Sequence, residues 1–362
     1  MGKQESTMEN LEINSFWSGK RVLVTGHTGF KGSWLSFWLH QLGAEVFGVA
    51  LEPETNPSLF GQLHLEKNIH HFIGDIRDEI LIRQKIITIQ PDIVFHLAAQ
   101  PLVRRSYREP LLTWQTNVMG TANLLNALVE IKSTCAVVIV TTDKVYENRE
   151  WIYPYRECDR LGGLDPYSSS KASAEIAVSS WRSSFFSIDS TVRIATARAG
   201  NVIGGGDWSE DRIIPDLVRA LSNNKPVLVR NPQSVRPWQH VLEPLKGYMR
   251  LAQILYESEN LQFQSAFNFG PEAKDFRCVQ ELVENALKVW PGSWVQSTQV
   301  QAPHEAGLLS LAIDKVRSVI SWQPKWNFEE SVLHTLEWYK LYYQGANPQE
   351  LCLVQLKLYS ER

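Results

Sequence analysis

Short apolar runs alternate with helix-like stretches through the first half of the chain. The β-rich runs lie at residues 21–25, 45–50, 70–73, 92–97, 136–140 and 191–196. Between these runs, apolar residues recur every three or four positions, which is the spacing of one helix face. This order predicts an α/β fold of the Rossmann type, with a doubly wound parallel sheet and helices on both of its faces. Such sheets bind ligands beyond the carboxyl ends of their strands.

The helical stretches each carry one apolar stripe. The first stripe consists of Trp34, Leu35, Trp38, Leu39 and Leu42. A second helix is expected at residues 77–90. A longer helix, at about 112–131, carries Trp114, Val118, Leu125 and Leu128 on one face. A further helix opens at Asp165-Pro166, a sequence that favours a helix N-terminus.

The chain after Asn201 differs from the first half in its pattern of glycine and proline residues. Three glycines form a loop at 204–206, and prolines recur at 215, 226, 232, 237 and 244. Helices are expected at 213–221, 243–256, 279–289 and 328–343, and short strands at 227–229 and 267–269. We interpret residues 17–200 as the Rossmann domain, with later elements at roughly 235–270 interleaved, and residues 201–345 as a smaller mixed α/β substrate domain. Residues 346–362 are interpreted as a C-terminal tail, although its run LCLVQLKLY is apolar enough to pack.

Composition narrows the class of protein. Hydrophobic residues make up 44% and charged residues 21% of the 362 residues, which is the globular range. The net charge of −3 favours neither nucleic acid nor an anionic membrane as a partner. No apolar run reaches membrane-span length, and the first fifteen residues lack a signal-peptide core. The four cysteines and nine histidines are scattered without ligand spacing, so we expect no metal site and a cytoplasmic location.

Glycines follow the first strand at a spacing of three: Gly26, Gly29 and Gly32. A glycine turn between a strand and a helix lets the backbone approach a pyrophosphate, and the helix N-terminus supplies amides. Asp75 follows the third strand and suits an adenine amino group. Ala98 and Ala99 follow the fourth strand and leave space for a ribose and nicotinamide. The alternative is an ordinary glycine-rich turn and ordinary loop residues, but the strand and helix around the turn favour a dinucleotide site.

Tyr167 and Lys171 are four residues apart on the predicted helix, so they share one face. A lysine ammonium beside a phenol is expected to lower the tyrosine pKa from its usual ~10. The phenolate would then take a proton from an alcohol near neutral pH. Thr142 lies at the end of the preceding strand, where its hydroxyl can bond the same alcohol oxygen. A tyrosine–lysine pair at this spacing is common, and the position at a strand end is what favours a catalytic role.

Four motifs together resemble the extended short-chain dehydrogenase/reductase family over about residues 17–343: GHTGFKG at 26–32, HLAAQ at 96–100, TTDK at 141–144 and YSSSK at 167–171. GHTGFKGSWL, TTDKVYENREW and GNVIGGGDW are more narrowly similar to its CDP-glucose 4,6-dehydratase branch. The resemblance implies a nucleotide-sugar substrate, CDP-glucose, and a catalytic triad of Thr142, Tyr167 and Lys171, with Asn117 as the helix asparagine. Related dTDP-glucose dehydratases have Asp-Glu after the threonine, whereas Asp143-Lys144 is typical of the CDP-glucose branch.

The resemblance implies NAD as the cofactor. Its expected contacts are Gly26, Thr28, Gly29, Phe30, Lys31, Gly32, Asp75, Ile76, Leu97, Ala98, Ala99, Tyr167 and Lys171. Many NAD sites end the second strand in an acid that holds the ribose. Here Glu52 is displaced by a residue or two, and Lys31 could contact the ribose region instead. Charge alone therefore leaves NADP open, and the resemblance favours NAD.

The substrate contacts are also implied by the resemblance. Arginine suits a diphosphate through its planar donor fork. Arg212, Arg236 and Asn201 match diphosphate positions, Ser106 is placed to meet the sugar, and His304 and Glu305 fall in a loop near the nucleotide. For each residue alone, a surface ion pair or a loop cap is an equally good explanation. Spacing does not identify cytosine over thymine or uracil.

The expected reaction has three steps. Tyr167 removes the proton of the sugar 4-hydroxyl while a hydride passes from carbon 4 to NAD. Lys144 then takes the carbon 5 proton and Asp143 protonates the departing 6-hydroxyl, and the hydride returns to carbon 6. The product, a CDP-4-keto-6-deoxy sugar, belongs to deoxysugar and O-antigen biosynthesis. A nucleotide-sugar 4-epimerase and a non-catalytic NAD-sensing regulator stay open. If the chain behaves like its relatives, helices 112–131 and 167–185 form the interface of a homodimer or homotetramer.

Overall fold

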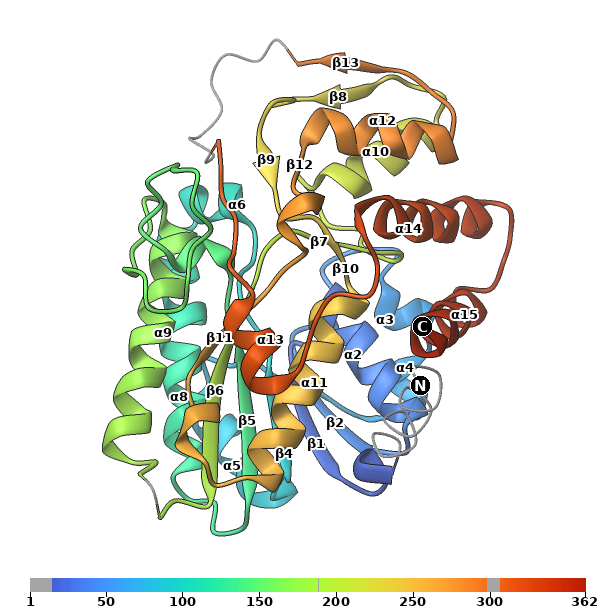
Figure 1. Ribbon diagram of the computed structural model, residues 1–362. Helices are drawn as coiled ribbons and strands as arrows, with labels where there is room; N and C mark the ends of the chain where they lie inside the picture. The colour runs from blue at the N-terminus through green and yellow to red at the C-terminus, as the bar shows by residue number, and fades with distance from the viewer. Residues whose placement is uncertain (1–14, 188, 298–306) are drawn as a thin grey trace, which may run out of the picture.

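A parallel sheet lies at the centre of the protein (Figure 1). The computed structural model describes residues 15–187, 189–297 and 307–362. Within these ranges the sheet has seven strands, in the spatial order β11 (Ala266–Phe269), β6 (Val192–Ala199), β5 (Cys135–Val140), β4 (Ile93–His96), β1 (Arg21–Thr25), β2 (Glu45–Ala50) and β3 (His70–Ile73). Because β1 pairs with β2 on one side and β4 on the other, the strand order reverses there, and a ligand crevice is expected beyond these strand ends.

Helices cover both faces of the sheet. One face packs against α5 (Glu79–Ile89), α8 (Gly120–Leu128) and α9 (Pro166–Ser184), and the other against α2 (Phe30–Gln41) and α11 (Leu242–Glu257). Alternate residues of β1 enter the two cores, Val22 and Val24 in one and Leu23 in the other. Strands β4, β5 and β6 are buried along their whole length, which explains the uninterrupted apolar run of β5. Strand β6 also buries Arg193 and Arg198. The predicted doubly wound Rossmann-type fold is confirmed.

The long helix expected at 112–131 is interrupted. The chain forms α6 (Val103–Arg108), α7 (Pro110–Trp114), a π-helical stretch, η1 (Gln115–Met119), and then α8. A π-helical turn inserts a residue into the helical repeat and shifts the phase of the following stripe. Trp114 is consequently 40% exposed, whereas Leu125 and Leu128 are buried. The prediction of one continuous apolar face was therefore wrong for the first half of this segment, which contains Trp114.

The elements after β6 divide between the sheet and a second group. β11 and α11 return to the sheet. The second group contains three strand pairs: β7 (Val202–Ile203) with β10 (Gln239–His240), β9 (Val235–Arg236) with β12 (Arg277–Cys278), and β8 (Val227–Val229) with β13 (Trp294–Gln296). Helices α10 (Ile213–Ser222) and α12 (Val279–Val289) lie beside β8 and β13 at the top of Figure 1. The remaining short elements are α3 (Leu59–Gln62), α4 (Leu65–Asn68), α13 (Asp314–Ile320), η2 (Asp143–Val145), η3 (Leu261–Phe263) and η4 (Ala273–Asp275).

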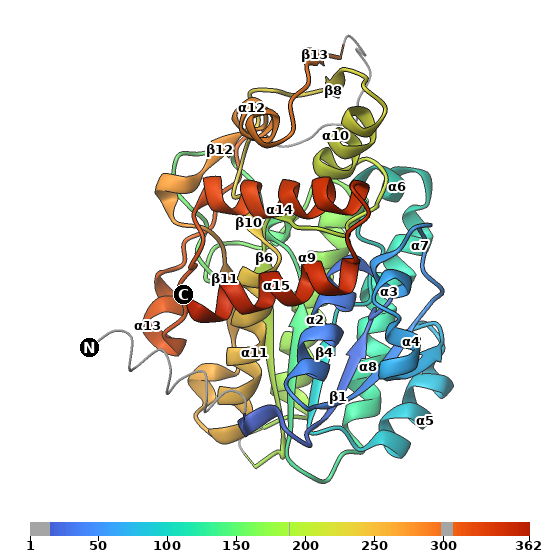
Figure 2. The ribbon, with the colours of Figure 1, turned by 90° about the vertical axis from the view of Figure 1, so that its right-hand side faces the viewer.

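The expected C-terminal tail is a packed helix, as its apolar run allowed. α15 (Pro348–Glu361) lies beside α14 (Phe328–Tyr343), and both face the viewer in Figure 2. Cys352, Leu356 and Tyr359 are buried on its inner face. The Tyr359 hydroxyl donates a hydrogen bond of 2.7 Å to Glu243 Oε2 on α11, which ties the helix to the rest of the chain.

Candidate active site

A cavity of about 1450 Å³ opens at the carboxyl ends of the central strands. Its walls include the glycine turn after β1, the turns after β3 and β4, and the segment after β5. The loop from Asn201 to Arg212 and parts of β8 and β9 close the opposite side. Typical small-molecule sites have ~300–1,000 Å³, so this cavity is large enough for a dinucleotide and a second ligand together.

The glycine turn has the geometry of a pyrophosphate cradle. Gly26 has φ +77°, and a Cβ there would lie 2.6 Å from the Ala98 nitrogen. A Cβ on Gly32 would lie 2.1 Å from the Gly26 carbonyl oxygen. Gly29 is the N-cap of α2 and offers no side-chain cap, so the first amides of the helix are not taken by a side chain. Thr28 Oγ1 donates to the Leu51 carbonyl at 2.9 Å and ties the turn to the end of β2. The turn therefore fits a dinucleotide.

Gly32→Ala should weaken dinucleotide binding strongly. The added methyl would force the Gly26 carbonyl away and open the turn. Overpacking of this kind costs ~1–3 kcal/mol, so we expect NAD affinity to fall on the order of 10–100-fold. Isothermal titration with NAD measures the effect. Gly270→Ala is the matched control, because its nearest atom would lie 3.6 Å away; an unchanged affinity in Gly32→Ala would contradict the proposed cradle.

The other predicted cofactor residues also line the cavity. Leu97, Ala98 and Ala99 follow β4, and Ile76 lies in the turn after β3. Asp75 already has a partner: Arg77 Nε donates to its carboxylate at 2.9 Å, and this hydrogen bond holds the pKa of Asp75 below its usual value. An adenine amino group would share the carboxylate with Arg77.

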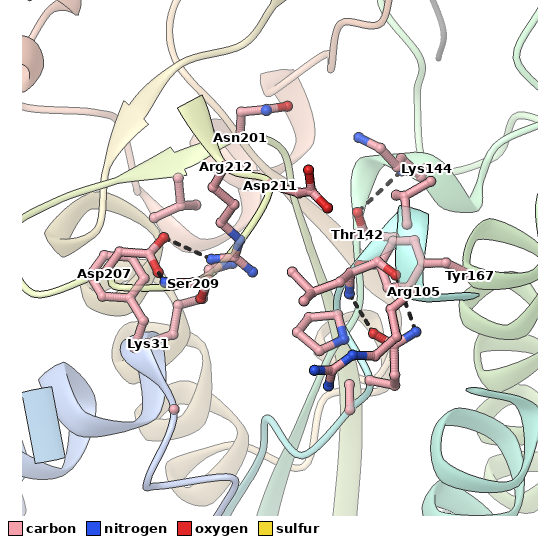
Figure 3. Close-up of a pocket in the computed structure, with 18 of the residues that line it drawn as sticks. Lys31, Arg105, Thr142, Lys144, Tyr167, Asn201, Asp207, Ser209, Asp211 and Arg212 are labelled. Carbon is pink, nitrogen blue, oxygen red and sulfur yellow. Dashed lines mark hydrogen bonds and ion pairs between the residues drawn. The ribbon is translucent and has the colours of Figure 1, made fainter. Parts of the chain in front are cut away.

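Thr142, Lys144 and Tyr167 lie on the same side of the pocket in Figure 3, and Lys171 also lines the cavity. Thr142 lies two residues beyond β5 and is the N-cap of η2. Tyr167 lies in the first turn of α9, which Asp165 caps by accepting a 2.9 Å hydrogen bond from the Ser168 amide. Lys171 follows one turn later on the same helix. The strand end and the helix start thus bring together residues that are far apart in the sequence.

The prediction that the pKa of Tyr167 lies below its usual value is wrong. Burial raises the pKa of Tyr167 to about 12, against the lowering effects of a hydrogen bond with Thr142 and of the Arg212 charge. Lys171 instead donates to the Val140 carbonyl at 3.0 Å. Burial lowers the pKa of Lys171 itself to about 8, while the nearby Glu175 raises it. The sequence spacing predicted the shared helix face but could not account for burial or for the Val140 carbonyl.

Asp143 and Lys144 lie directly beside the triad. The Thr142 hydroxyl donates to Asp143 Oδ1 at 2.9 Å, and the Asp143 side chain is 1% exposed. Lys144 Nζ lies 3.9 Å from the same Oδ1, and its side chain is 28% exposed. Both residues line the cavity. The pair therefore places a buried carboxyl group and a more accessible amine at the same end of the cavity as Tyr167.

The opposite wall carries positive charge. Arg212 Nη1 donates to Asp207 Oδ2 at 2.9 Å, and Asp207 Oδ1 accepts from the Ser209 amide at 3.1 Å. Lys31 is on the same side of the pocket as Asp207 and Arg212 in Figure 3. Burial and the charge of Arg212 lower the pKa of Lys31 to about 7, and Asp143 opposes this shift. Two further predicted residues of the diphosphate site, Arg236 and Asn201, also line this part of the cavity.

Two predicted residues that the structure describes, Ser106 and Asn117, do not line the cavity. Ser106 is fully buried; its Oγ accepts a 3.1 Å hydrogen bond from the Tyr167 amide and donates to the Val103 carbonyl at 2.7 Å. Its hydroxyl thus supports the first turn of α9 instead of facing the sugar. Asn117 donates to Ser170 Oγ at 2.9 Å and accepts from the Gln100 amide, so it supports the same helix. His304, with Glu305, lies outside the described residues.

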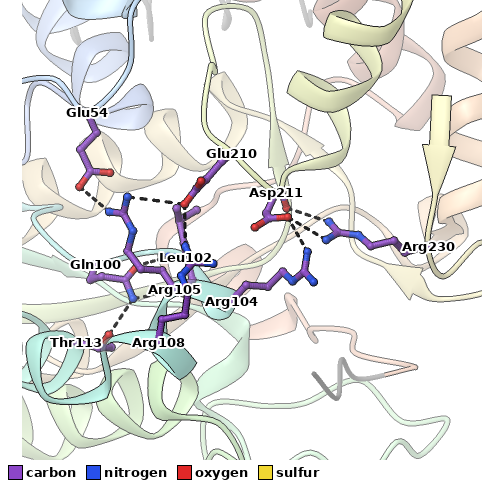
Figure 4. A network of polar contacts seen from close by, with 10 residues as sticks. All are labelled: Glu54, Gln100, Leu102, Arg104, Arg105, Arg108, Thr113, Glu210, Asp211 and Arg230. Carbon is purple, nitrogen blue, oxygen red and sulfur yellow. Dashed lines mark hydrogen bonds and ion pairs between the residues drawn. The ribbon is translucent and has the colours of Figure 1, made fainter. Parts of the chain in front are cut away.

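A network of ion pairs across the cavity was not predicted from the sequence (Figure 4). It joins the loop after β2, α6, the loop before α10 and the end of β8. Its pairs are Glu54–Arg105, Arg105–Glu210, Arg108–Glu210, Arg104–Asp211 and Asp211–Arg230, with separations of 2.8–3.8 Å. The available signals were the arginine pair at 104–105, three residues after HLAAQ, and the acidic pair before Arg212. In the described ranges, no group of three His, Cys, Asp or Glu side chains could hold a metal, and no helix is long and apolar enough to cross a bilayer.

Known proteins resemble this chain over most of its length. The family described as GDP-mannose 4,6 dehydratase matches residues 23–335. The chain is 48% identical to the CDP-glucose 4,6-dehydratase of Salmonella typhimurium, over 92% of this chain and 94% of that protein. A crystal structure of dTDP-glucose 4,6-dehydratase from Bacillus anthracis in complex with NAD has a TM-score of 0.72 at 21% identity and covers 91% of this chain and 99% of that chain.

A UDP-glucose 4-epimerase from Thermotoga maritima, solved with UDP-glucose, has a TM-score of 0.75 at 22% identity, over 89% of this chain and 99% of that chain. Likeness at such low identity establishes the fold alone. Two other findings establish the family. It matches 313 consecutive residues (23 to 335), and the chain is 48% identical to a relative of nearly equal extent. The chain therefore belongs to the GDP-mannose 4,6-dehydratase family, within the extended short-chain dehydrogenases/reductases.

Proposed function

We propose that this enzyme is a hydro-lyase that converts CDP-D-glucose to CDP-4-keto-6-deoxy-D-glucose and water, with NAD as its cofactor. The observation that carries the proposal is the meeting of Thr142, Asp143, Lys144, Tyr167 and Lys171 at one end of a single cavity. An oxidation needs only the triad, whereas the acid–base pair beside it serves an elimination. The choice of a cytidine nucleotide rests on the 48% identity to a CDP-glucose 4,6-dehydratase.

NAD fits the glycine side of the cavity. Gly26 and Gly32 leave no room for a Cβ, and the first amides of α2 have no side-chain cap. The cofactor contacts predicted from the sequence are retained, with the amide of Lys31 in place of its side chain. When bound, NAD supplies the acceptor and later the donor of the hydride that moves between carbons 4 and 6. Solved relatives of the same fold, including a dTDP-glucose 4,6-dehydratase, hold NAD.

Tyr167 acts as the base in the first step. Its phenolate takes the proton of the 4-hydroxyl, and the Thr142 hydroxyl positions the same oxygen. Lys171 lies one helical turn away, where its ammonium is held by the Val140 carbonyl. From that position it adds positive charge to this end of the cavity and would bind the nicotinamide ribose of the cofactor.

Lys144 and Asp143 serve the second step. The 4-ketone acidifies the proton on carbon 5, and Lys144, the more accessible of the two, removes it as a neutral amine. Asp143, held by the Thr142 hydroxyl, donates a proton to the departing 6-hydroxyl. When the hydride reaches carbon 6, Lys144 returns its proton to carbon 5, and the proton that Tyr167 took from the 4-hydroxyl replaces the one that Asp143 gave. Arg212, Arg236 and Asn201 hold the diphosphate on the opposite wall, and His304 is proposed as a further nucleotide contact.

The test is incubation of the purified enzyme with NAD and, separately, CDP-, dTDP- and UDP-glucose, followed by mass spectrometry. Loss of one water from CDP-glucose is expected, with little product from the other two. A product of unchanged mass that separates from CDP-glucose by chromatography would indicate a 4-epimerase. Recovery of all three sugars unchanged would favour a non-catalytic, NAD-binding role.

NAD should support turnover better than NADP. Glu52 lines the cavity just beyond β2, where a carboxylate disfavours a 2′-phosphate. Lys31, the candidate partner for such a phosphate, lies on the side of Asp207 and Arg212. We expect at least a tenfold preference, equivalent to ~1.4 kcal/mol, in apo-enzyme reconstituted with each cofactor. Glu52→Gln should reduce the preference; equal rates with the two cofactors in the unmodified enzyme would overturn the assignment.

We further propose that the enzyme is a cytoplasmic homodimer or homotetramer. Helices α7 to α9 expose Leu111, Trp114, Ile176 and Phe185, which suits burial against a second copy. The proposed domains are a Rossmann domain at 17–200 with elements near 235–270 interleaved, and a substrate domain at 201–345. All four cysteines are free, as expected in a reducing compartment. Deoxysugar synthesis for surface polysaccharide is the corresponding biological role.

A further inference from the structure

A buried ion pair joins α9 to β6. Arg198 on β6 donates two parallel hydrogen bonds to Glu175 on α9, from Nε to Oε1 and from Nη2 to Oε2, each 2.9 Å long. Each side chain is 4% exposed. Neither is among the described residues that line the cavity, so neither touches a ligand there. Replacing a buried ion pair with well-packed apolar residues often leaves stability unchanged or raises it, so the burial of this pair is weak evidence of a purely stabilising role.

Glu175 holds the end of β5. Its Oε1 accepts a 2.5 Å hydrogen bond from the hydroxyl of Thr141, the residue directly before Thr142. Glu175 lies one turn after Lys171 on the same face of α9, and Lys171 donates to the Val140 carbonyl at 3.0 Å. Two successive turns of α9 therefore hold two successive residues at the end of β5. The helix that carries the catalytic base thus also sets the position of the Thr142 backbone.

Arg198 holds the other end of the same segment. Its Nη1 donates to the Tyr146 hydroxyl at 2.9 Å, and that hydroxyl donates to Asn268 Oδ1 on β11 at 2.7 Å. Tyr146 is 1% exposed and lies two residues beyond Lys144. The three reactive residues at 142–144 therefore lie between two points that are fixed to one ion pair.

We propose that this ion pair consists of two positioning residues that serve both half-reactions. Through its hydrogen bond with Thr141, Glu175 keeps the next residue, the catalytic threonine, beside the base for the oxidation. Through its hydrogen bond with Tyr146, Arg198 keeps Lys144 in place for the elimination. This inference rests on the proposed function. Neither residue acts on the sugar itself, because the effect of each passes through the side chain that it binds.

Thr141→Val and Thr196→Val separate positioning from stability. Both hydroxyls are buried and donate to the Glu175 carboxylate, at 2.5 and 2.7 Å, but Thr196 lies within β6 and is not among the described residues that line the cavity. Each variant removes one hydrogen bond to the same carboxylate, so the two should lower the thermal unfolding temperature alike. Only Thr141→Val should slow single-turnover reduction of NAD, at saturating NAD and CDP-glucose, by about 10–100-fold, because a misplacement of ~1 Å can cost ~10²-fold. Thr141→Ser keeps the hydroxyl and should restore the rate.

Tyr146→Phe tests the other end of the segment. It removes the hydroxyl that Arg198 binds and keeps the ring. Exchange of the carbon 5 proton with solvent deuterium should fall by about 10–100-fold, because the amine of Lys144 is no longer held in place. Reduction of NAD should stay within a factor of about two, since the oxidation does not use that amine.

The outcomes separate the inference from the function. No loss of water from CDP-glucose with the unmodified enzyme would overturn the proposed function before any variant is compared. Equal rates of NAD reduction in Thr141→Val and Thr196→Val would overturn the inference alone, as would a Thr141→Ser variant as slow as Thr141→Val. Unchanged carbon 5 exchange in Tyr146→Phe, or an equal slowing of both steps, would also overturn it. Thr141→Ala replaces Thr141→Val if that variant does not fold.

Discussion

Tyr167→Phe should abolish oxidation at carbon 4 while it leaves the fold and NAD binding intact. The phenolic hydroxyl is the only group removed, and the ring keeps its packing in the first turn of α9. Removal of one general base costs about 10²–10⁴-fold in rate, and the first step limits everything that follows. Single-turnover reduction of bound NAD by CDP-glucose measures this step directly.

Tyr248→Phe is the matched control for that experiment. Its hydroxyl is buried without a hydrogen-bond partner among the described residues, and it does not line the cavity. Its loss should leave the rate within a factor of about two, since no proton transfer depends on it. If Tyr167→Phe reduced NAD as fast as Tyr248→Phe, the base would have to be another residue and the role of α9 in the chemistry would be lost.

Lys144→Ala should separate oxidation from elimination. The variant keeps Tyr167, Thr142 and Lys171, so it should still reduce bound NAD and then stall with the reduced cofactor. Exchange of the carbon 5 proton with solvent deuterium should fall by about 10²–10⁴-fold, because the amine that removes this proton is gone. The measurement combines stopped-flow absorbance with mass spectrometry of the sugar recovered from deuterium oxide.

Asp143→Asn and Lys225→Ala complete the comparison. Asp143→Asn should keep the carbon 5 exchange and slow the loss of the 6-hydroxyl, since only the acid is missing. Lys225 is an exposed lysine away from the cavity, and its replacement should change neither step. Normal dehydration and exchange in Lys144→Ala would make Lys144 a bystander, and the enzyme would then resemble an epimerase whose base lies elsewhere.

Local patterns were sufficient to predict the sheet and the catalytic end of the cavity. Strand β5 is buried along its whole length, and its uninterrupted apolar run was enough to predict it. Thr142 follows the end of that strand and Tyr167 lies at the start of α9, so both positions could also be predicted. The π-helical stretch at Gln115–Met119 has no comparable local signal, so the phase of the stripe before it was misjudged. The apolar run after Gly345 indicated that this segment could pack, and in the structure it forms helix α15.

Interactions between segments that are distant in the chain could not be predicted from the sequence. The pKa of Tyr167 depends on how deeply α9 is buried and on Arg212, which lies 45 residues further along the chain. The bond of Arg104 to Asp211 joins residues 107 positions apart, and neither residue alone marks a site. Ser106 shows the opposite failure: a plausible position near the sugar became a buried support for Tyr167. The spacing of residues in the sequence shows which side chains share a face of one helix or strand. It cannot show which charged residues pair across a cavity, because that depends on the fold.

The most direct test of the central claim follows a deuterium label. The enzyme is incubated with NAD and CDP-glucose that carries deuterium at carbon 4, and the product is examined by mass spectrometry and by NMR. Internal transfer of the hydride predicts a product that has lost one water and carries the deuterium at carbon 6. A dehydrated product without the label, or a sugar of unchanged mass with the label still at carbon 4, would contradict the account.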